Sequence, residues 1–481
     1  GIPFVIVEKN AGPGGTWWEN SYPGARVDVA NHLYCYSFEP SNHWQHFFAE
    51  QPELAAYFDD VLRRNDLGEH VRYNTEVVSA AWDDDAATWT VTVRTGDGTE
   101  TLTAQAVITA VGQLNRPQLP ELPGRETFGG PSFHSARWDH DVDLTGKRVA
   151  LVGAGASGFQ IAPAVAEQVA HLDVFQRTAQ WMFPNPMYHD RVPDGARWAM
   201  QHLPYYARWY RFLLLWPGAD KGLDAARVDP QYPDQDHAVS EVNALARMMF
   251  TDWITGQVGE DAELLAKVLP DYPATGKRTL QDNGSWLATL KRADVRLIRT
   301  PIERVTTGGL VTADGETYAA DVIVYATGFQ ATALLAPMTI TGRGGADLHQ
   351  QWGRRPYAYL GVTVPNFPNL FMMYGPGTHL AHGGSLIMHS ELQMRYINAC
   401  LEHLIDTGAR SMEPLPGPTE AWHRRTQQQI TQTVWAHPSI EHSYFKNADG
   451  EIHTVSPWRL CEYRAILQDQ DWSQFDVRRR P

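Results

Sequence analysis

The chain has 481 residues and a formal net charge of −15, with 43% apolar and 20% charged residues. This length allows two or three domains, and the acidic balance disfavours non-specific nucleic-acid binding. The 3 cysteines, Cys35, Cys400 and Cys461, are too widely separated for a disulfide framework or a CxxC metal site. No apolar run is long enough to span a bilayer. We therefore expect a cytoplasmic globular protein with no metal site, no nucleic-acid partner and no membrane span.

The first predicted strand covers residues 4–7 and ends at Glu8. An acid at the end of the second strand of a dinucleotide-binding domain binds a ribose hydroxyl, so we interpret Glu8 as a cofactor ligand. The glycine motif that normally precedes this acid is missing. The usual spacing places it about 15 residues before Gly1, and we expect the chain to begin inside its first nucleotide-binding domain.

An aromatic, glycine-rich segment follows, "GGTWWENSYPGARVDV", which spans residues 14–29. Large flat side chains suit stacking on a planar ligand, although burial in a core is their more common role. Two later strands end in "TAVGQ" and "YATGF", where small residues allow the backbone to pass close to a flat cofactor.

The second nucleotide-binding motif is complete. In "RVALVGAGASG", Gly153, Gly155 and Gly158 form G-x-G-x-x-G, with Ser157 beside the last glycine, between a strand and a helix. The glycines allow close approach to a pyrophosphate at the helix N-terminus. The next strand ends "VFQRT", and its Arg177, followed by Thr178, favours the 2′-phosphate of NADP over NAD.

These patterns predict an α/β fold with two dinucleotide-binding, Rossmann-like domains and a helical insertion. We assign residues 1–140 to the first part of one dinucleotide-binding domain, whose glycine motif is missing, and 141–325 to an NADP-binding domain. An aromatic-rich helical insertion is expected at about residues 184–268. Residues 326–481 are assigned to the second part of the first domain and a C-terminal segment.

Two long motifs carry a resemblance to a known family. The first follows [AG]-G-x-W-x4-[FY]-P-G-x3-D, and the second follows F-x-G-x3-H-x3-W-[PD]. The matching residues are Gly14, Gly15, Trp17, Tyr22, Pro23, Gly24 and Asp28 for the first, and Phe128, Gly130, His134, Trp138 and Asp139 for the second. With these motifs the chain resembles the flavin-dependent Baeyer–Villiger monooxygenases, and among them most the 4-hydroxyacetophenone monooxygenase type.

The resemblance implies an enzyme that uses FAD, NADPH and O2, with residues 1–140 and 326–481 as the two parts of its FAD-binding domain. In this family NADPH reduces FAD, and the reduced flavin takes O2 to give a C4a-peroxyflavin. The peroxide attacks the ketone carbonyl, and the resulting adduct rearranges to an ester or lactone. The aromatic residues of the helical insertion suit a small-molecule ketone that is aryl or bulky, and burial in a core is their equal alternative, so the sequence does not fix the ketone.

The resemblance also implies roles for single residues. Arg278 in "TGKRTLQ" aligns with the catalytic arginine, which stabilises the peroxide anion and the adduct, and Asp28 is expected to pair with it. Lys277 is expected to join Arg177 and Thr178 around the 2′-phosphate. Gly15, Thr16, Trp17 and Asp28 are expected to contact FAD, together with Glu8.

Three further segments resemble parts of the family. His134 and Trp138 are expected to act structurally at the link between domains, not as acid or base. Residues 372–385 are expected near the flavin ring, and Tyr444 aligns loosely with a tryptophan that covers the nicotinamide in relatives.

Two alternatives remain open on the residues. The first is a flavin monooxygenase that oxidises nitrogen or sulfur, although its second motif typically lacks the ending seen at Trp138 and Asp139. The second is a non-catalytic nucleotide-binding protein, or a catalytically incompetent fragment, because the first glycine motif is missing. The sequence leaves a homodimer possible.

Overall fold

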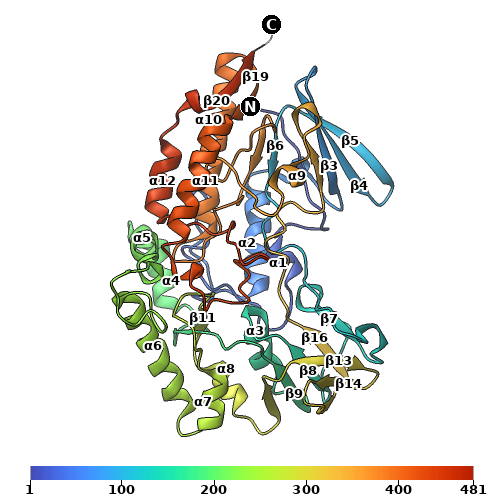
Figure 1. The fold of residues 1–481 in the computed structure, drawn as a ribbon, viewed down its shortest axis with the longest axis vertical. Helices are drawn as coiled ribbons and strands as arrows, with labels where there is room; N and C mark the ends of the chain where they lie inside the picture. The colour runs from blue at the N-terminus through green and yellow to red at the C-terminus, as the bar shows by residue number, and fades with distance from the viewer. Residues whose placement is uncertain (1, 480–481) are drawn as a thin grey trace.

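The computed structural model describes residues 2–479 and shows an α/β protein (Figure 1). Its clearest unit is a parallel five-stranded sheet with strand order β12-β9-β8-β16-β7. The strands are β7 (Ser132–His134), β8 (Arg148–Val152), β9 (His171–Phe175), β12 (Val295–Ile298) and β16 (Val322–Tyr325). Buried, mostly apolar residues fill β8, β9 and β16, as expected for parallel strands covered on both faces. The predicted boundary at residue 141 falls between β7 and the other four strands.

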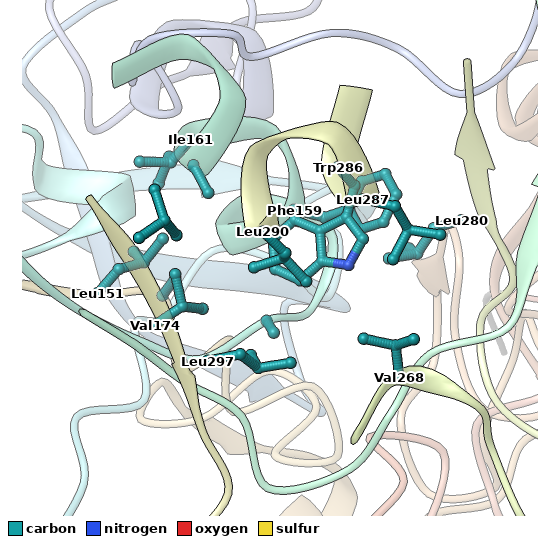
Figure 2. Close-up of a cluster of buried hydrophobic side chains, with 14 of the residues drawn as sticks. Leu151, Phe159, Ile161, Val174, Val268, Leu280, Trp286, Leu287, Leu290 and Leu297 are labelled. Atoms are coloured by element: carbon teal, nitrogen blue, oxygen red, sulfur yellow. The ribbon is translucent and has the colours of Figure 1, made fainter. Parts of the chain in front are cut away.

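The core of this unit lies between the sheet and two helices, α3 (Ala156–Val165) and α8 (Ser285–Leu290). Figure 2 shows Leu151 and Val174 from the strands facing Phe159 and Trp286 from the helices. The rings of Phe159 and Trp286 stack with centroids 4.9 Å apart. This packing fixes the N-terminus of α3, which follows the glycine turn. A small antiparallel sheet, β13 (Ile302–Thr306), β14 (Gly309–Thr312) and β15 (Thr317–Ala319), leads from β12 toward β16.

The residues on both sides of this unit form a second set of sheets. Two of them are parallel pairs: β1 (Ile6–Val7) with β2 (Val71–Arg72), and β6 (Val107–Thr109) with β18 (Leu370–Met372). The predicted strand at residues 4–7 is thus a strand only from Ile6. A four-stranded sheet joins β3 (Glu76–Asp83), β4 (Thr88–Thr95), β5 (Gly98–Ala104) and β17 (Thr339–Thr341). Chain segments from before and after the five-stranded unit therefore pair with each other.

Within the chain segment that connects β9 to β12, a group of helices lies on one side of the molecule (Figure 1). They are α4 (Asp194–His202), α5 (Tyr206–Trp216), α6 (Glu241–Val258) and α7 (Ala262–Val268). Strands β10 (Met182–Pro184) and β11 (Leu280–Asp282) pair in parallel where this helical segment leaves and rejoins the unit.

The remaining helices lie beside the other sheets, with α10, α11 and α12 together on one side (Figure 1). They are α1 (Thr16–Glu19), α2 (Gln51–Arg64), α9 (Leu348–Trp352), α10 (Leu386–Thr407), α11 (Pro416–Ile430) and α12 (Leu460–Gln468), and β19 (Ala409–Pro414) pairs with β20 (Phe475–Arg479). Within residues 2–479, no helix is both long enough and apolar enough to cross a bilayer.

Candidate active site

A cavity of about 1800 Å³ connects the nucleotide-binding unit with the rest of the protein. Its walls come from the aromatic N-terminal segment, the glycine turn before α3, the end of β9, the Lys277–Arg278 segment and the loop before α10. The described lining residues include most of the predicted site: Thr16, Trp17, Asp28, Gly153, Gly155, Ser157, Arg177, Thr178, Lys277 and Arg278. Residues from distant parts of the sequence are thus brought to one space.

Arg278 and Asp28 form an ion pair on the cavity wall, with Nη2 of Arg278 donating to Oδ2 of Asp28. The two side chains are 36% and 34% exposed, so both face the open cavity. The Asp28 carboxylate raises the pKa of Arg278, and Tyr444 and Tyr188 add smaller contributions in the same direction. A guanidinium in this position stays charged and has a fixed direction.

Aromatic side chains surround the ion pair. The indole N–H of Trp17 donates to the Tyr34 hydroxyl at 3.1 Å, and the two rings meet edge to face. Burial raises the pKa of Tyr34 to about 12, so its hydroxyl stays protonated. Tyr374 and Tyr444 also line the cavity, and burial raises the pKa of Tyr444, with a smaller lowering by the charge of Arg278. These rings provide flat, rigid surfaces on which a planar ligand can stack.

The glycine turn before α3 meets its geometric requirements. Gly153 has a φ of +109°, and a Cβ there would lie 2.4 Å from the carbonyl oxygen of Ala326. A Cβ on Gly158 would lie 2.0 Å from the carbonyl oxygen of Gly153. Gly155 is the N-cap of α3, so the turn presents free backbone N–H groups to the cavity.

Cationic side chains gather beyond this turn. Arg177 and Lys277 line the same part of the cavity, and burial, with the charge of Arg177, lowers the pKa of Lys277 to about 8. The Lys277 Nζ lies 4.7 Å from the centre of the Tyr272 ring. The sequence analysis missed Arg299, which lines the cavity and donates to the Arg177 carbonyl at 3.4 Å. Its signal is the ending "RLIRT" of β12, which matches "VFQRT" of the neighbouring β9.

The N-terminal segment also docks on α3. The Tyr22 hydroxyl donates to Gln160 Oε1 at 3.0 Å, and Gln160 Nε2 donates to the Arg26 carbonyl at 2.8 Å and to the Tyr188 hydroxyl at 2.9 Å. Gly24 has a φ of +80°, and a Cβ there would lie 2.5 Å from the Gln160 carbonyl oxygen. The Tyr-Pro-Gly turn therefore fixes the position of Asp28 against the nucleotide-binding unit, a role that the sequence analysis did not identify.

Three predicted ligands are not among the described residues that line this cavity: Glu8, Gly15 and Gly158. Glu8 follows β1, and its Oε1 accepts the backbone N–H of Asn10 at 2.7 Å. Gly15 has a φ of +52° and caps α1, whereas Gly158 is buried at the start of α3. Gly15 and Gly158 are thus chain neighbours of the lining residues Thr16 and Ser157, and the cofactor-binding roles of Glu8, Gly15 and Gly158 stay predictions.

His134 and Trp138 lie at the edge of the five-stranded sheet. His134 is buried, its Nδ1 accepts the backbone N–H of Ala136 at 3.1 Å, and burial lowers its pKa to about 4. Trp138 packs edge to face on Phe133, with centroids 5.1 Å apart. A neutral, enclosed histidine of this kind supports the structural role that we expected for it.

The loop at residues 372–385 contributes His382 to the cavity lining. Burial lowers the pKa of His382 to about 4, so the ring is neutral at pH 7. The backbone N–H of Leu380, in the same loop, donates to the Tyr374 hydroxyl at 2.9 Å. This loop therefore lines the cavity with neutral groups, whereas Arg177 and Lys277 line another part of it with positive charge.

Comparison with known proteins agrees with this arrangement. A family model described as "FMO-like: Flavin-binding monooxygenase-like" matches residues 20–195. A Baeyer–Villiger monooxygenase of Streptomyces coelicolor is 34% identical over 477 residues, which cover 99% of this chain and 88% of that protein.

Solved structures match over nearly the whole chain. An oxidized steroid monooxygenase bound to NADP has a TM-score of 0.84 at 30% identity, covering 99% of this chain and 95% of that one. OTEMO in complex with FAD and NADP has a TM-score of 0.84 at 26% identity, with the same two coverages, 99% and 95%. The predicted fold class is confirmed, and the predicted cofactors are those of the OTEMO complex, FAD and NADP, while the steroid monooxygenase structure holds NADP. The finer resemblance to the 4-hydroxyacetophenone monooxygenase type stays a prediction.

The relative from Streptomyces coelicolor matches almost end to end, and the cavity holds the aligned Arg278–Asp28 pair beside a complete glycine turn. The chain therefore belongs to the flavin-binding monooxygenases and, within them, to the Baeyer–Villiger monooxygenase family.

Proposed function

We propose that the protein is an FAD- and NADPH-dependent Baeyer–Villiger monooxygenase that converts ketones to esters or lactones with O2. The observation that carries this proposal is the Arg278–Asp28 ion pair, which faces the same cavity as the glycine turn and the Arg177–Lys277 cations. A permanent positive charge in an enclosed site stabilises an oxygen anion that forms beside it.

The described residues suit NADPH and the isoalloxazine part of FAD. The backbone N–H groups at the N-terminus of α3 suit the pyrophosphate of NADPH, because Gly153 and Gly158 leave no side chain in the way. Arg177, Thr178, Lys277 and Arg299 suit its 2′-phosphate. Thr16, Trp17, Tyr34 and Tyr374 offer hydroxyls and flat rings for the isoalloxazine of FAD. Bound FAD supplies the redox chemistry with O2, which side chains lack.

The chain's own residues prepare the site for the ketone. Asp28 fixes the Arg278 guanidinium, and the contacts of Tyr22 and Gln160 fix the segment that carries Asp28. Arg278 would then stabilise negative charge on the oxygen that attacks the ketone. It would also stabilise the alkoxide that the carbonyl oxygen becomes after the attack. Because a guanidinium does not lose its proton near neutral pH, Arg278 does not act as a general acid.

The ketone is, in this proposal, an aryl or bulky one. The cavity is large, and its wall includes the rings of Phe183, Phe250 and Tyr444 together with the small side chains of Ala225 and Ala226. Rings and small residues together leave space for a wide apolar substrate.

The proposal includes an assignment of domains. Residues 1–140 and 326–481 form the FAD-binding part, and residues 141–325 form the NADP-binding part with its helical insertion at about 184–268. The free cysteines Cys35, Cys400 and Cys461 support a reducing, cytoplasmic location.

A substrate panel tests the proposal. The protein is incubated with FAD, NADPH and O2, first with aryl and bicyclic ketones and then with an amine and a sulfide, and the products are identified by mass spectrometry. We expect esters or lactones from the ketones. Formation of N- or S-oxides without any ester would support a heteroatom monooxygenase instead, and a protein that stays colourless after incubation with FAD would contradict flavin binding.

A further inference from the structure

One stretch of the helical insertion contacts two separate walls of the active-site cavity. We call residues 217–226 the bridging segment, and it begins with a π-helical turn at Pro217–Lys221. Turns of this kind are rare and frequently lie at functional sites. The segment also reaches the cavity itself, which is lined by Gly222, Ala225 and Ala226.

On one side, the bridging segment meets the loop before α10 backbone to backbone. A Cβ on Gly218 would lie 2.7 Å from the Gly384 backbone nitrogen, and a Cβ on Gly222 would lie 2.7 Å from that of Gly383. In the reverse direction, a Cβ on Gly383 would lie 2.6 Å from the Gly218 Cα. Only glycine on both surfaces permits so close an approach. Because His382, Gly383 and Gly384 line the cavity, the contact fixes part of its wall.

Buried and charged contacts hold the bridging segment against the C-terminal helices. Ala219 is buried in the hydrophobic core that contains Trp458 and Tyr463. Arg459, at the start of α12, donates from Nη2 to Oδ1 of Asp224 at 2.8 Å. A shift of the segment away from the loop before α10 would break this packing, since protein interiors have little free space.

On the other side, the bridging segment is bonded to the residues that precede Arg278. The Ala225 carbonyl accepts hydrogen bonds from Nδ2 of Asn243 at 2.7 Å and from Oγ1 of Thr275 at 3.1 Å. Thr275 has a φ of +60°, which a β-branched residue adopts only where its surroundings enforce it. The hydroxyl contact therefore holds the strained backbone that leads into Arg278.

We infer that the bridging segment is a positioning element for the ketone reaction, with Gly218, Gly222 and Ala225 as its contact points. It sets the distance between two walls of the cavity, the loop before α10 and the segment that carries Arg278. The inference rests on the proposed function, which places the ketone in this cavity. Such spacing matters because a displacement of about 1 Å can cost about 100-fold in rate.

Hydrogen exchange followed by mass spectrometry tests the connection without measuring activity. The full chain with FAD added is compared with Gly218→Ala, Thr275→Val and the control Gly256→Ala. Gly218→Ala adds a methyl group at the loop before α10, whereas Thr275→Val removes the hydroxyl that bonds to Ala225 and keeps the size of the side chain. Gly256 lies in α6 of the same insertion, where a Cβ would meet no described atom within 4 Å outside the backbone of its own helix. Thermal melting confirms that each variant is folded.

We expect each variant to disturb the wall that it does not touch. Gly218→Ala should speed exchange in residues 272–280, and Thr275→Val in residues 374–386, by at least about fivefold, the effect of losing one hydrogen bond. Gly256→Ala should match the wild type in both segments. Exchange that changes only beside the substituted residue would overturn the inference, and if Gly218→Ala does not fold, Thr275→Val alone decides.

Kinetics provide the second readout. Gly218→Ala is expected to lower kcat/KM for the ketone by at least about tenfold through the displaced wall. The KM for NADPH should change little, because the Arg177–Lys277 cations stay in place. An equal loss for ketone and NADPH would overturn the positioning role. A wild type that forms no ester from any ketone would overturn the proposed function, and the exchange measurements would still decide whether the bridging segment connects the two walls.

Discussion

Arg278 and Asp28, 250 residues apart in the chain, form an ion pair on the wall of the large cavity. The carboxylate both orients the guanidinium and raises its pKa, so Arg278 presents a fixed positive charge to the cavity. Baeyer–Villiger chemistry requires such a charge beside the oxygen that attacks the ketone. The role of this pair can be separated experimentally from cofactor binding.

Replacing Arg278 by alanine removes the charge but leaves the glycine turn and the Arg177–Lys277 cations in place. We expect ester formation to fall by at least about 100-fold, the usual effect of losing one group that stabilises an oxyanion. Stopped-flow absorbance is expected to show that NADPH still reduces the flavin at a similar rate. An Arg278→Ala enzyme with normal ester yield would refute the catalytic role.

The substitution Asp28→Asn keeps the shape of the side chain but removes its negative charge. Arg278 loses its fixed direction, so we expect about tenfold less ester per NADPH consumed, with the missing oxygen appearing as hydrogen peroxide. The control is Asp194→Asn at the exposed start of α4, where the side chain is 93% exposed. Equal coupling in the wild type and Asp28→Asn would show that the ion pair does not orient Arg278.

The two arginines at the ends of neighbouring strands, Arg177 after β9 and Arg299 after β12, are expected to select NADPH. Either alanine substitution should raise the KM for NADPH by at least about tenfold, since each removes a charged partner of the 2′-phosphate. The KM for NADH should change little. Arg304→Ala, on exposed β13 and paired only with Glu303 among its described contacts, serves as the control. An equal loss with both nucleotides would contradict the assignment.

The contact between Gly24 and Gln160 predicts a structural defect with a functional signature. A Cβ at Gly24 would lie 2.5 Å from the Gln160 carbonyl oxygen, in a residue whose φ is +80°. We expect Gly24→Ala to lower the free energy of unfolding by about 1–3 kcal/mol and to uncouple NADPH oxidation from ester formation. Chemical denaturation and product analysis measure the two effects. A variant with wild-type stability would show that this contact is not close in solution.

Buried histidines predict a loss of stability in mild acid. Burial lowers the pKa of His379 and of His389 from 6.5 to about 3. The unfolded chain therefore binds protons below pH 6.5 that the folded protein does not bind, and the free energy of unfolding falls as the pH decreases from 6.5 toward 3. Each such histidine removes up to about 1.4 kcal/mol per pH unit.

Urea denaturation at pH 7.5 and 5.5 measures this loss. His389 stacks on Tyr463 with centroids 4.5 Å apart, and neither ring nitrogen has a hydrogen-bond partner in the part of the chain that the structure describes. His389→Phe keeps the ring and removes the titration, so we expect a smaller loss of stability between the two pH values. An identical loss in wild type and variant would contradict the explanation.

The residues that carry the chemistry could be predicted from the sequence, but the tertiary contacts that position them could not. The glycine turn and Arg177 could be predicted because both follow buried strands whose pattern is local. Arg278 and Asp28 were paired by family resemblance alone, since no local pattern brings together residues so far apart. The role of Arg299 could be predicted only with the knowledge that β12 lies beside β9 in the sheet. The Gly24–Gln160 contact depends on how the N-terminal segment packs on α3, which periodicity does not reveal.

The most direct test of the central claim follows the oxygen atom. The FAD-loaded enzyme converts an aryl ketone with NADPH under ¹⁸O2, and mass spectrometry determines the label in the product. We predict an ester that contains one ¹⁸O atom, with about one NADPH consumed per ester formed. An unlabelled ester, or NADPH oxidation that yields only hydrogen peroxide across the whole ketone panel, would contradict the account.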